Sequence, residues 1–315
     1  MCRMDVAAFL LSTTFMYSAP LIFTALGGVL SENGGVVNIG LEGMMYFGAF
    51  VGAAAAYYSG NPWIGFLAAG ACGGLLSLLH AIACVTFKAN NTISGLAINF
   101  IGPGFALFLS RLMFDGATYT LPLGDKKMGM PLKGLFPQGS FWDHLLGTQC
   151  YTTYLAFLLV PVVWFLLKKT RLGLRIRSVG EYPKAADTLG IPVAKIQYFV
   201  VITGGILAGF GGASLSIAVS SAFNPTIVTG QGFIALSAIV FGKWKPQGAL
   251  AACLIFGFST SIGIVLGWSN IQAVFPVPSQ ILAMLPFIVS LVILAGFVGK
   301  STAPSSAGIP YEKDN

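Results

Sequence analysis

Long apolar stretches separated by short polar breaks run along almost the whole chain. The breaks carry Gly, Pro and Asn, as in Gly60-Asn61-Pro62, and such residues end helices. About 20 mostly apolar residues span a hydrocarbon core of roughly 30 Å. The pattern therefore predicts an all-α membrane bundle of about nine spans, with a range of eight to ten. The stretches are 6–30, 39–59, 63–87, 92–114, 151–167, 196–222, 226–242, 247–267 and 280–299. The seventh is the least regular, because Gly230 and Gly232 interrupt it.

Composition excludes a water-soluble fold. Charged residues make up 9% of the 315, whereas a soluble domain carries about 25%. The 17 basic and 10 acidic side chains cannot cover the outside of a protein of this size. The net charge of +7 does not indicate nucleic-acid binding, because most basic residues lie between apolar stretches. We therefore expect a multi-pass integral membrane protein.

The basic residues predict the orientation, because cytoplasmic loops of membrane proteins are enriched in Lys and Arg. If residues 168–195 and the C-terminal tail 300–315 are cytoplasmic, twelve basic residues fall inside and five outside. Those inside are Lys88, Lys168, Lys169, Arg171, Arg175, Arg177, Lys184, Lys195, Lys243, Lys245, Lys300 and Lys313; those outside are Arg3, Arg111, Lys126, Lys127 and Lys133. Loop 115–150 is then extracytoplasmic, and 1–315 forms one transmembrane domain. The N-terminus falls outside, and a miscount of one helix would reverse that placement.

Small residues recur in the apolar stretches, as at 52–56, 70–74 and 204–212. They let helix backbones approach closely in lipid, where no hydrophobic force drives association. This pattern is typical of tight packing, and also of helices that rock against each other during transport.

The sequence predicts neither an enzyme nor a metal or cofactor site. The one approximation to a phosphate-binding loop, Gly299-Lys300-Ser301, lacks its first glycine because position 294 is Leu294. The two histidines and five cysteines show no ligand spacing for zinc. Few acidic residues lie near the apolar stretches, chiefly Glu32 and Glu42, which disfavours ion-coupled secondary transport but leaves it as an alternative.

A short helix is predicted inside the most charged segment of the chain. Pro183 suits a first helical turn, and Gly190 suits a left-handed C-cap with Pro192 just beyond. A helix of about two turns is marginal alone and needs a surface to dock on. An ordinary basic cytoplasmic loop is the alternative.

The segment GLRIRSVGEYPKAADTLGI resembles the cytoplasmic coupling segment of ABC-importer permeases of the branched-chain amino acid and ribose superfamily. SENGGVVNIGLEGMM (31–45), NNTISGLAINF (90–100), GQGFIALSAIVFGKWKPQGAL (230–250) and APSSAGIPYEK (303–313) resemble one branch, the permeases of nucleoside-type importers. The resemblance runs almost end to end. It implies a multi-pass transport subunit of the bacterial inner (plasma) membrane. Such a subunit works with a second permease chain, ATP-binding subunits and an extracytoplasmic substrate-binding (lipo)protein.

The resemblance also implies which residues couple the permease to the ATPase. These are Glu181, Tyr182, Pro183, Lys184, Ala185, Ala186, Asp187, Thr188, Leu189 and Gly190. Relatives more often carry Asn where Tyr182 stands, a departure that we expect to tune the contact with the ATPase and not to remove it.

Polar residues inside apolar stretches are costly, so they are candidates for the translocation path. With neighbouring aromatic residues, the candidates are Asn38, Glu42, Ser94, Asn99, Phe223, Gln231 and Phe233. Each has a structural alternative: an interhelical hydrogen bond for Asn99, a helix cap for Asn38, and a packed outer gate for the group around Phe223.

The resulting hypothesis is the permease subunit of an ATP-driven importer, carrying a small polar solute of the nucleoside class, with loop 115–150 docking the binding protein. Riboflavin or a simple sugar is the alternative solute, and an ion-coupled secondary transporter is the alternative of another class.

Overall fold

The computed structural model describes residues 3–137, 140–267, 278–296 and 302–312, and this part of the chain is helical with no β-strand. The helices are α1 (Arg3–Asn33), α2 (Leu41–Ser59), α3 (Pro62–Ala81), α4 (Asn91–Met113), α5 (Tyr151–Lys169), α6 (Arg171–Glu181), α7 (Pro183–Thr188), α8 (Val193–Ala213), α9 (Gln231–Phe241), α10 (Pro246–Leu266), α12 (Ser279–Ala283) and α13 (Leu285–Gly296). Wider π-helical turns extend α3 (Ile82–Thr86) and α8 (Ser214–Val219), and short turns in the long loop lie at Gly124–Lys126 and Asp143–Gly147.

The all-helical prediction is confirmed, and each of the nine apolar stretches contains a helix. Six helices are long and apolar enough to cross a membrane: Val6–Asn33, Pro62–Thr86, Asn91–Met113, Tyr151–Lys169, Val193–Val219 and Pro246–Leu266. The count of nine spans stays a prediction. The seventh stretch becomes helical only at Gln231, because residues 226–230 form turns, and the end of the ninth lies outside the described residues. The segment 168–195 holds two helices, α6 and α7, where the sequence predicted one.

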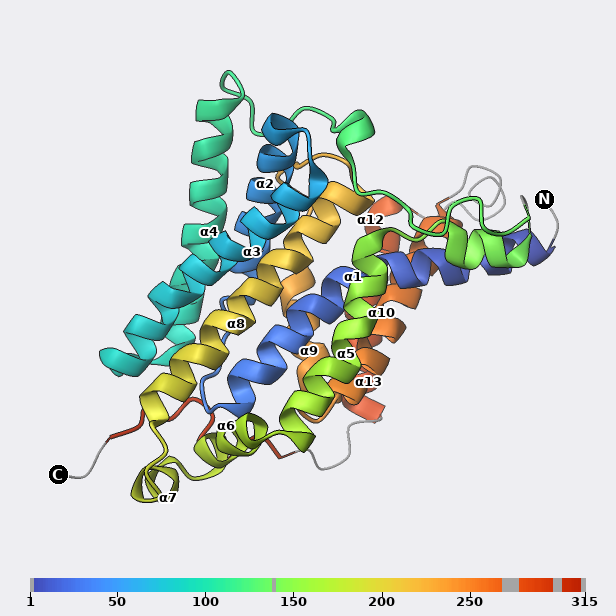
Figure 1. The fold of residues 1–315 in the computed structure, drawn as a ribbon. Helices are drawn as coiled ribbons and strands as arrows, with labels where there is room; N and C mark the ends of the chain where they lie inside the picture. Colours follow the sequence, from blue (N-terminus) through green and yellow to red (C-terminus); the bar gives the residue numbers. More distant parts are fainter. Residues whose placement is uncertain (1–2, 138–139, 268–277, 297–301, 313–315) are drawn as a thin grey trace.

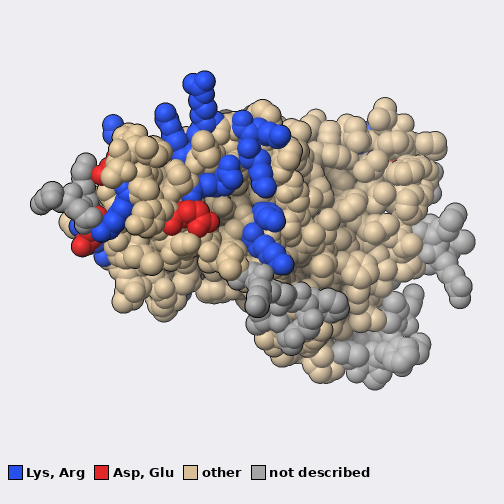
Figure 2. Space-filling view, turned by 90° about the horizontal axis from the view of Figure 1, so that it is seen from below, with Lys and Arg blue, Asp and Glu red and all other residues tan. Residues whose placement is uncertain are grey.

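The helices alternate in direction along the bundle (Figure 1). α1, α3 and α5 run toward the end that carries α6 and α7, and α2, α4 and α8 run back from it. The start of α1 and the long loop after α4 lie at the opposite end from residues 302–312. Seen from below, the α6–α7 end carries many Lys and Arg side chains (Figure 2). This end is therefore the one that we expect in the cytoplasm.

α8 forms the centre of the bundle, and its glycines allow three helices to approach it closely. It packs against α1, α2 and α3. A Cβ built on Gly209 would lie 2.2 Å from the Ala69 carbonyl oxygen, and one on Gly212 would lie 1.9 Å from the Met45 carbonyl oxygen. No side chain fits at such distances, so these glycines set the spacing between α8 and its neighbours. The small residues thus pack tightly in this conformation.

Replacing Gly212 with Leu should reduce the free energy of unfolding by about 3 kcal/mol, the upper part of the range for overpacked cores. Thermal unfolding in detergent, together with the monodisperse fraction on gel filtration, measures the effect. The matched control is Gly104→Leu in α4, where a Cβ would meet nothing within 4 Å. Equal losses in both variants would contradict the close-packing argument.

Candidate functional site

α9 starts inside the protein, and the carboxylate of Glu42 on α2 caps its first turn. Glu42 accepts hydrogen bonds from the backbone N–H of Gly230 through Oε1 and of Gly232 through Oε2, both at 2.6 Å. The first N–H groups of a helix have no partner within the helix, and they form its positive end. Gly230 takes a left-handed φ of +80°, which glycine adopts without strain. Glu42 therefore holds the turn from which α9 begins.

The break between α1 and α2 is held by two asparagine side chains. Asn99 on α4 accepts from the Gly43 N–H at 2.8 Å and donates to the Ile39 carbonyl at 3.0 Å. Asn38 is fully buried, and its Oδ1 accepts from the Gly40 N–H at 3.1 Å. The Asn99 contacts match its structural alternative, an interhelical hydrogen bond. Asn38 instead bonds the N–H two residues further on, and it does not cap α2, whose N-cap is Gly40. Both side chains satisfy backbone groups that lipid would leave unpaired.

Ser94 lies beside the same break and contacts a buried histidine. Its Oγ is 2.8 Å from Nδ1 of His80, whose Nε2 is 3.2 Å from the Val37 carbonyl oxygen. His80 thus joins α3 and α4 to the residues before α2. Ser94 supports the break in this conformation, as Asn38 and Asn99 do.

Phe223 anchors the non-helical segment between α8 and α9. Its ring is fully buried and packs edge-on against Tyr46 and Phe50 of α2, with centroids 5.5 and 5.4 Å away. Its backbone exchanges hydrogen bonds with Thr120, since the Phe223 N–H donates to the Thr120 hydroxyl and its carbonyl accepts from the Thr120 N–H. Loop 115–150 therefore holds the segment between α8 and α9 in place through these hydrogen bonds. Phe233, in contrast, lies on the surface of α9 with 44% of its area exposed.

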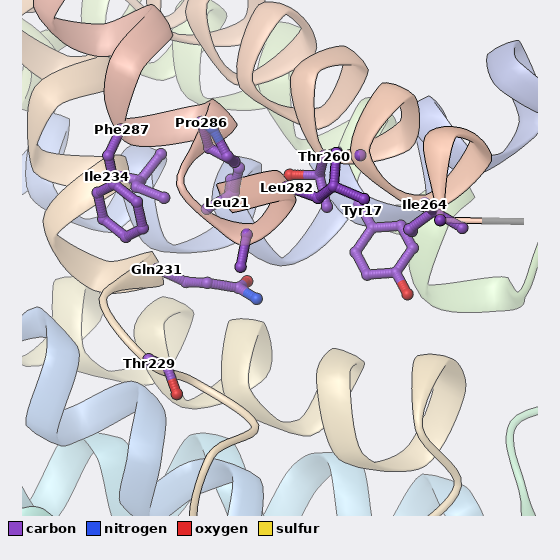
Figure 3. Close-up of a pocket in the computed structure, with 13 residues that line it drawn as sticks. Tyr17, Leu21, Thr229, Gln231, Ile234, Thr260, Ile264, Leu282, Pro286 and Phe287 are labelled. Carbon is purple, nitrogen blue, oxygen red and sulfur yellow. The ribbon is translucent and has the colours of Figure 1, made fainter. Parts of the chain in front are cut away.

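Gln231 lines a cavity of about 350 Å³ between α1, α9, α10 and the α12–α13 pair (Figure 3). In the close-up, its side chain extends into the middle of the lining residues. The other polar lining groups are Tyr17, Thr229 and Thr260, and the remainder is mostly apolar, including Leu21 and Phe287. The cavity lies within the size range of small-molecule sites, with few polar groups on an apolar wall.

Of the candidate path residues, the structure places Gln231 on this cavity. Sequence reasoning missed Tyr17, Thr229, Thr260 and Phe287. Tyr17 and Thr260 are polar residues within apolar stretches, a signal that the sequence contains. Their proximity to Gln231 depends on how α1 and α10 pack against α9, and the sequence does not show that.

The segment expected to couple to an ATPase contains a helix at the predicted place. α7 starts at Pro183, and Gly190 just beyond it has φ +75°. Ala186 is buried, whereas Tyr182 is 64% and Leu189 80% exposed. Two large apolar side chains thus flank α7 at the surface of the basic end of the bundle.

The C-terminal tail forms hydrogen bonds both with the end of α6, just before α7, and with the break between α1 and α2. The Ser305 hydroxyl donates to the Glu181 carboxylate at 2.9 Å, and the Ser306 N–H donates to the Gly180 carbonyl at 2.9 Å. The Gly308 N–H donates to the Gly35 carbonyl at 3.0 Å. The tail therefore links α6 to the segment that leads into α2.

Comparison with known proteins identifies relatives over nearly the whole chain. Residues 10–295 match the family described as branched-chain amino acid transport system / permease component. A guanosine ABC transporter permease protein of Bacillus subtilis is 42% identical over 98% of both chains. A nucleoside ABC transporter permease protein of Lactococcus lactis is 38% identical over 96% of both. A putative glucose ABC transporter permease protein of Haloferax volcanii is 39% identical over 81% of this chain and 76% of its own.

Replacing Glu42 with Gln should lower the free energy of unfolding by about 2 kcal/mol, because one backbone N–H at the start of α9 then faces an amide donor. Thermal unfolding in detergent tests this expectation. The control is Glu312→Gln, which removes an exposed ion pair to Lys88 at 3.5 Å and should leave stability unchanged. A Glu42→Gln variant as stable as the control would show that the carboxylate does not hold this turn.

Proposed function

The chain belongs to the permease-component family of branched-chain amino acid transport systems, and from that membership we propose that it forms the translocation path of an ATP-driven importer of nucleosides. It is a multi-pass inner-membrane transport subunit and not an enzyme. The observation that carries the nucleoside assignment is the match to a guanosine permease and a nucleoside permease over at least 96% of the chain. Transport would proceed by alternating access, with no covalent chemistry in this subunit.

The cavity beside the start of α9 is the proposed solute site. A nucleoside combines a ribose with several hydroxyls and an aromatic base. The Gln231 amide offers donors and an acceptor, and the Phe287 ring offers an apolar face. The Thr229 and Thr260 hydroxyls donate to the carbonyls of Thr226 and Phe256, so they offer acceptors. Because α9 starts beside this cavity, a shift of that turn would change the site.

The remaining path candidates have a supporting role in this proposal. Glu42 and Phe223 hold the turn and segment from which α9 begins, and Asn38, Asn99 and Ser94 hold the break before α2. We assign them to the part of the path that rearranges when access alternates. Phe233 faces outward from α9, where a neighbouring permease chain would contact it.

α7 and its flanking residues, 181–190, are the proposed contact with the ATP-binding subunits. A helix of only six residues is marginal by itself. Tyr182 and Leu189 present apolar surface at the basic end of the bundle, where a soluble subunit can cover it. The tail contacts with Gly180 and Glu181 then give a direct route from this helix to the break before α2.

The direction of the helices supports the remaining assignments of this proposal. Residues 1–315 form one transmembrane domain, with α9 and the α12–α13 pair completing nine crossings. Segment 168–195 and the tail 300–315 lie in the cytoplasm, and loop 115–150 faces the extracytoplasmic binding protein. A second permease chain completes the transporter.

A sugar is the second candidate solute, because the relative named as a putative glucose permease is 39% identical. Hydroxyl and amide groups of the cavity would serve a sugar as well. An aromatic base would in addition stack ring on ring against Phe287, whereas a sugar would present only C–H groups to that ring.

Replacing Gln231 with Ala should raise the KM of guanosine uptake about tenfold, the effect of one or two lost hydrogen bonds, with little change in maximal rate. Uptake of labelled guanosine would be measured in cells that also produce the binding protein and the ATP-binding subunits. Gln247→Ala, at the exposed start of α10, is the matched control. If unlabelled glucose competed with guanosine for uptake and other nucleosides did not, the proposed solute would be a sugar and not a nucleoside.

Replacing Leu189 with Ala should weaken co-purification of the ATP-binding subunit about tenfold or more and reduce uptake in step, because a buried Leu contributes about 2 kcal/mol. The protein should stay folded in the membrane. Leu112→Ala, an exposed leucine on α4, is the control. Full uptake and full co-purification in the Leu189 variant would show that the coupling surface does not lie at α7.

A further inference from the structure

A basic pocket opens at the α6–α7 end of the bundle, separate from the cavity around Gln231. It has a volume of about 210 Å³ and lies between the ends of α1 and α5, helix α6, the α9–α10 turn and the tail. Four basic side chains line it, with a single carboxylate among them. They are Lys168, Arg177, Lys243 and Lys245, and the carboxylate is Glu181. Seen from below, Lys and Arg side chains surround an acidic one on this face (Figure 2).

The carboxylates nearest to the pocket already have other partners. Glu181 accepts from the hydroxyl and the N–H of Ser305, and Glu32 accepts from the Trp244 indole N–H. The Nε of Arg177 is buried and has no hydrogen-bond partner among the described residues. A buried donor of this kind is costly unless a partner occupies the pocket. The four basic side chains and the unpaired Arg177 Nε therefore fit an anion with several acceptor oxygens.

The depth of the pocket favours a lipid headgroup over a free anion. Lys168 stands in the last turn of α5, at the end of the apolar span Tyr151–Lys169. On the other side of the pocket, Pro246 begins the span Pro246–Leu266. Both positions mark the border between the hydrocarbon core and the headgroup layer.

An apolar groove lies beside α10, next to the basic pocket. The groove has a volume of about 230 Å³ and is lined by Phe241, Ala251, Ala252, Ile255 and Ile293, together with Lys243, which also lines the basic pocket. A basic site that meets an apolar groove at the membrane border matches an amphiphile, with its charge on one side of Lys243 and its chain on the other.

We propose that this pocket binds the headgroup of an anionic phospholipid, with one acyl chain in the groove beside Lys243. Arg177 and the three lysines hold the phosphate. The bound lipid contacts α5, α6 and the α9–α10 turn, so it stabilises the packing of α6 against the bundle. The proposal does not depend on the solute that the protein carries.

Native mass spectrometry of the full-length protein, titrated with phosphatidylglycerol or phosphatidylcholine, tests the proposal. The wild type should retain phosphatidylglycerol in preference to phosphatidylcholine. Lys243→Gln and Arg177→Gln should each lower the affinity for phosphatidylglycerol about fivefold, the contribution of one basic residue near an anionic surface. Lys127→Gln, a charge-matched change in the loop at the other end, should have no effect.

A second variant separates the lipid from a free anion. Ala251→Trp fills the groove without changing the charge, and it should weaken phosphatidylglycerol binding. Inorganic phosphate should not displace the lipid from the wild type. Displacement by inorganic phosphate, or unchanged lipid binding in the Lys243 and Arg177 variants, would overturn the proposal. So would loss of the ATP-binding subunit in these variants while lipid binding stays intact, because the pocket would then be a protein contact.

Discussion

In a lipid bilayer, every backbone N–H and C=O must find its partner inside the protein, because no water reaches the hydrocarbon core. Regular helices meet this requirement by themselves, but in the described part of the chain, partly buried non-helical segments precede α2 and α9. At these points polar side chains supply the hydrogen-bond partners of the backbone. Asn99 bonds a donor and an acceptor of the first break, and Glu42 bonds two donors of the second. The path of the chain before α2 and the start of α9 beside the cavity depend on these bonds.

The two breaks are physically joined, since Glu42 lies in the first turn of the helix that begins at the first break and caps the helix that begins at the second. The tail adds a third element, because Gly308 bonds to Gly35 while Ser306 bonds to Gly180 at the end of α6. A short series of direct contacts therefore links the end of α6 to the turn beside the cavity. Such contacts support the proposal that the ATP-binding subunits act on α6 and α7 from one side of the membrane.

The centre of the bundle is closely packed around α8. At the centre, the glycines of α8 face backbone atoms of α2 and α3 with no side chain between them. Interiors packed in this way shift between alternative arrangements and do not deform continuously. The small-residue pattern thus corresponds to tight packing in this conformation, and rocking of the helices during transport stays a prediction.

The sequence by itself determined the class of structure. Apolar stretches of sufficient length and the scarcity of charge predict a helical membrane bundle, and Pro183 and Gly190 mark the ends of α7, because these signals are local. Tertiary structure decided which polar residues meet. The sequence identifies Glu42, Asn99 and Gln231 as costly residues, but only the fold shows that the first two hold backbone breaks while Gln231 faces the cavity. The same holds for Arg177 and Lys243, whose positions 66 residues apart along the chain give no sign of a shared pocket. Local patterns report the length and polarity of each helix, whereas the partners of a side chain depend on how distant helices pack.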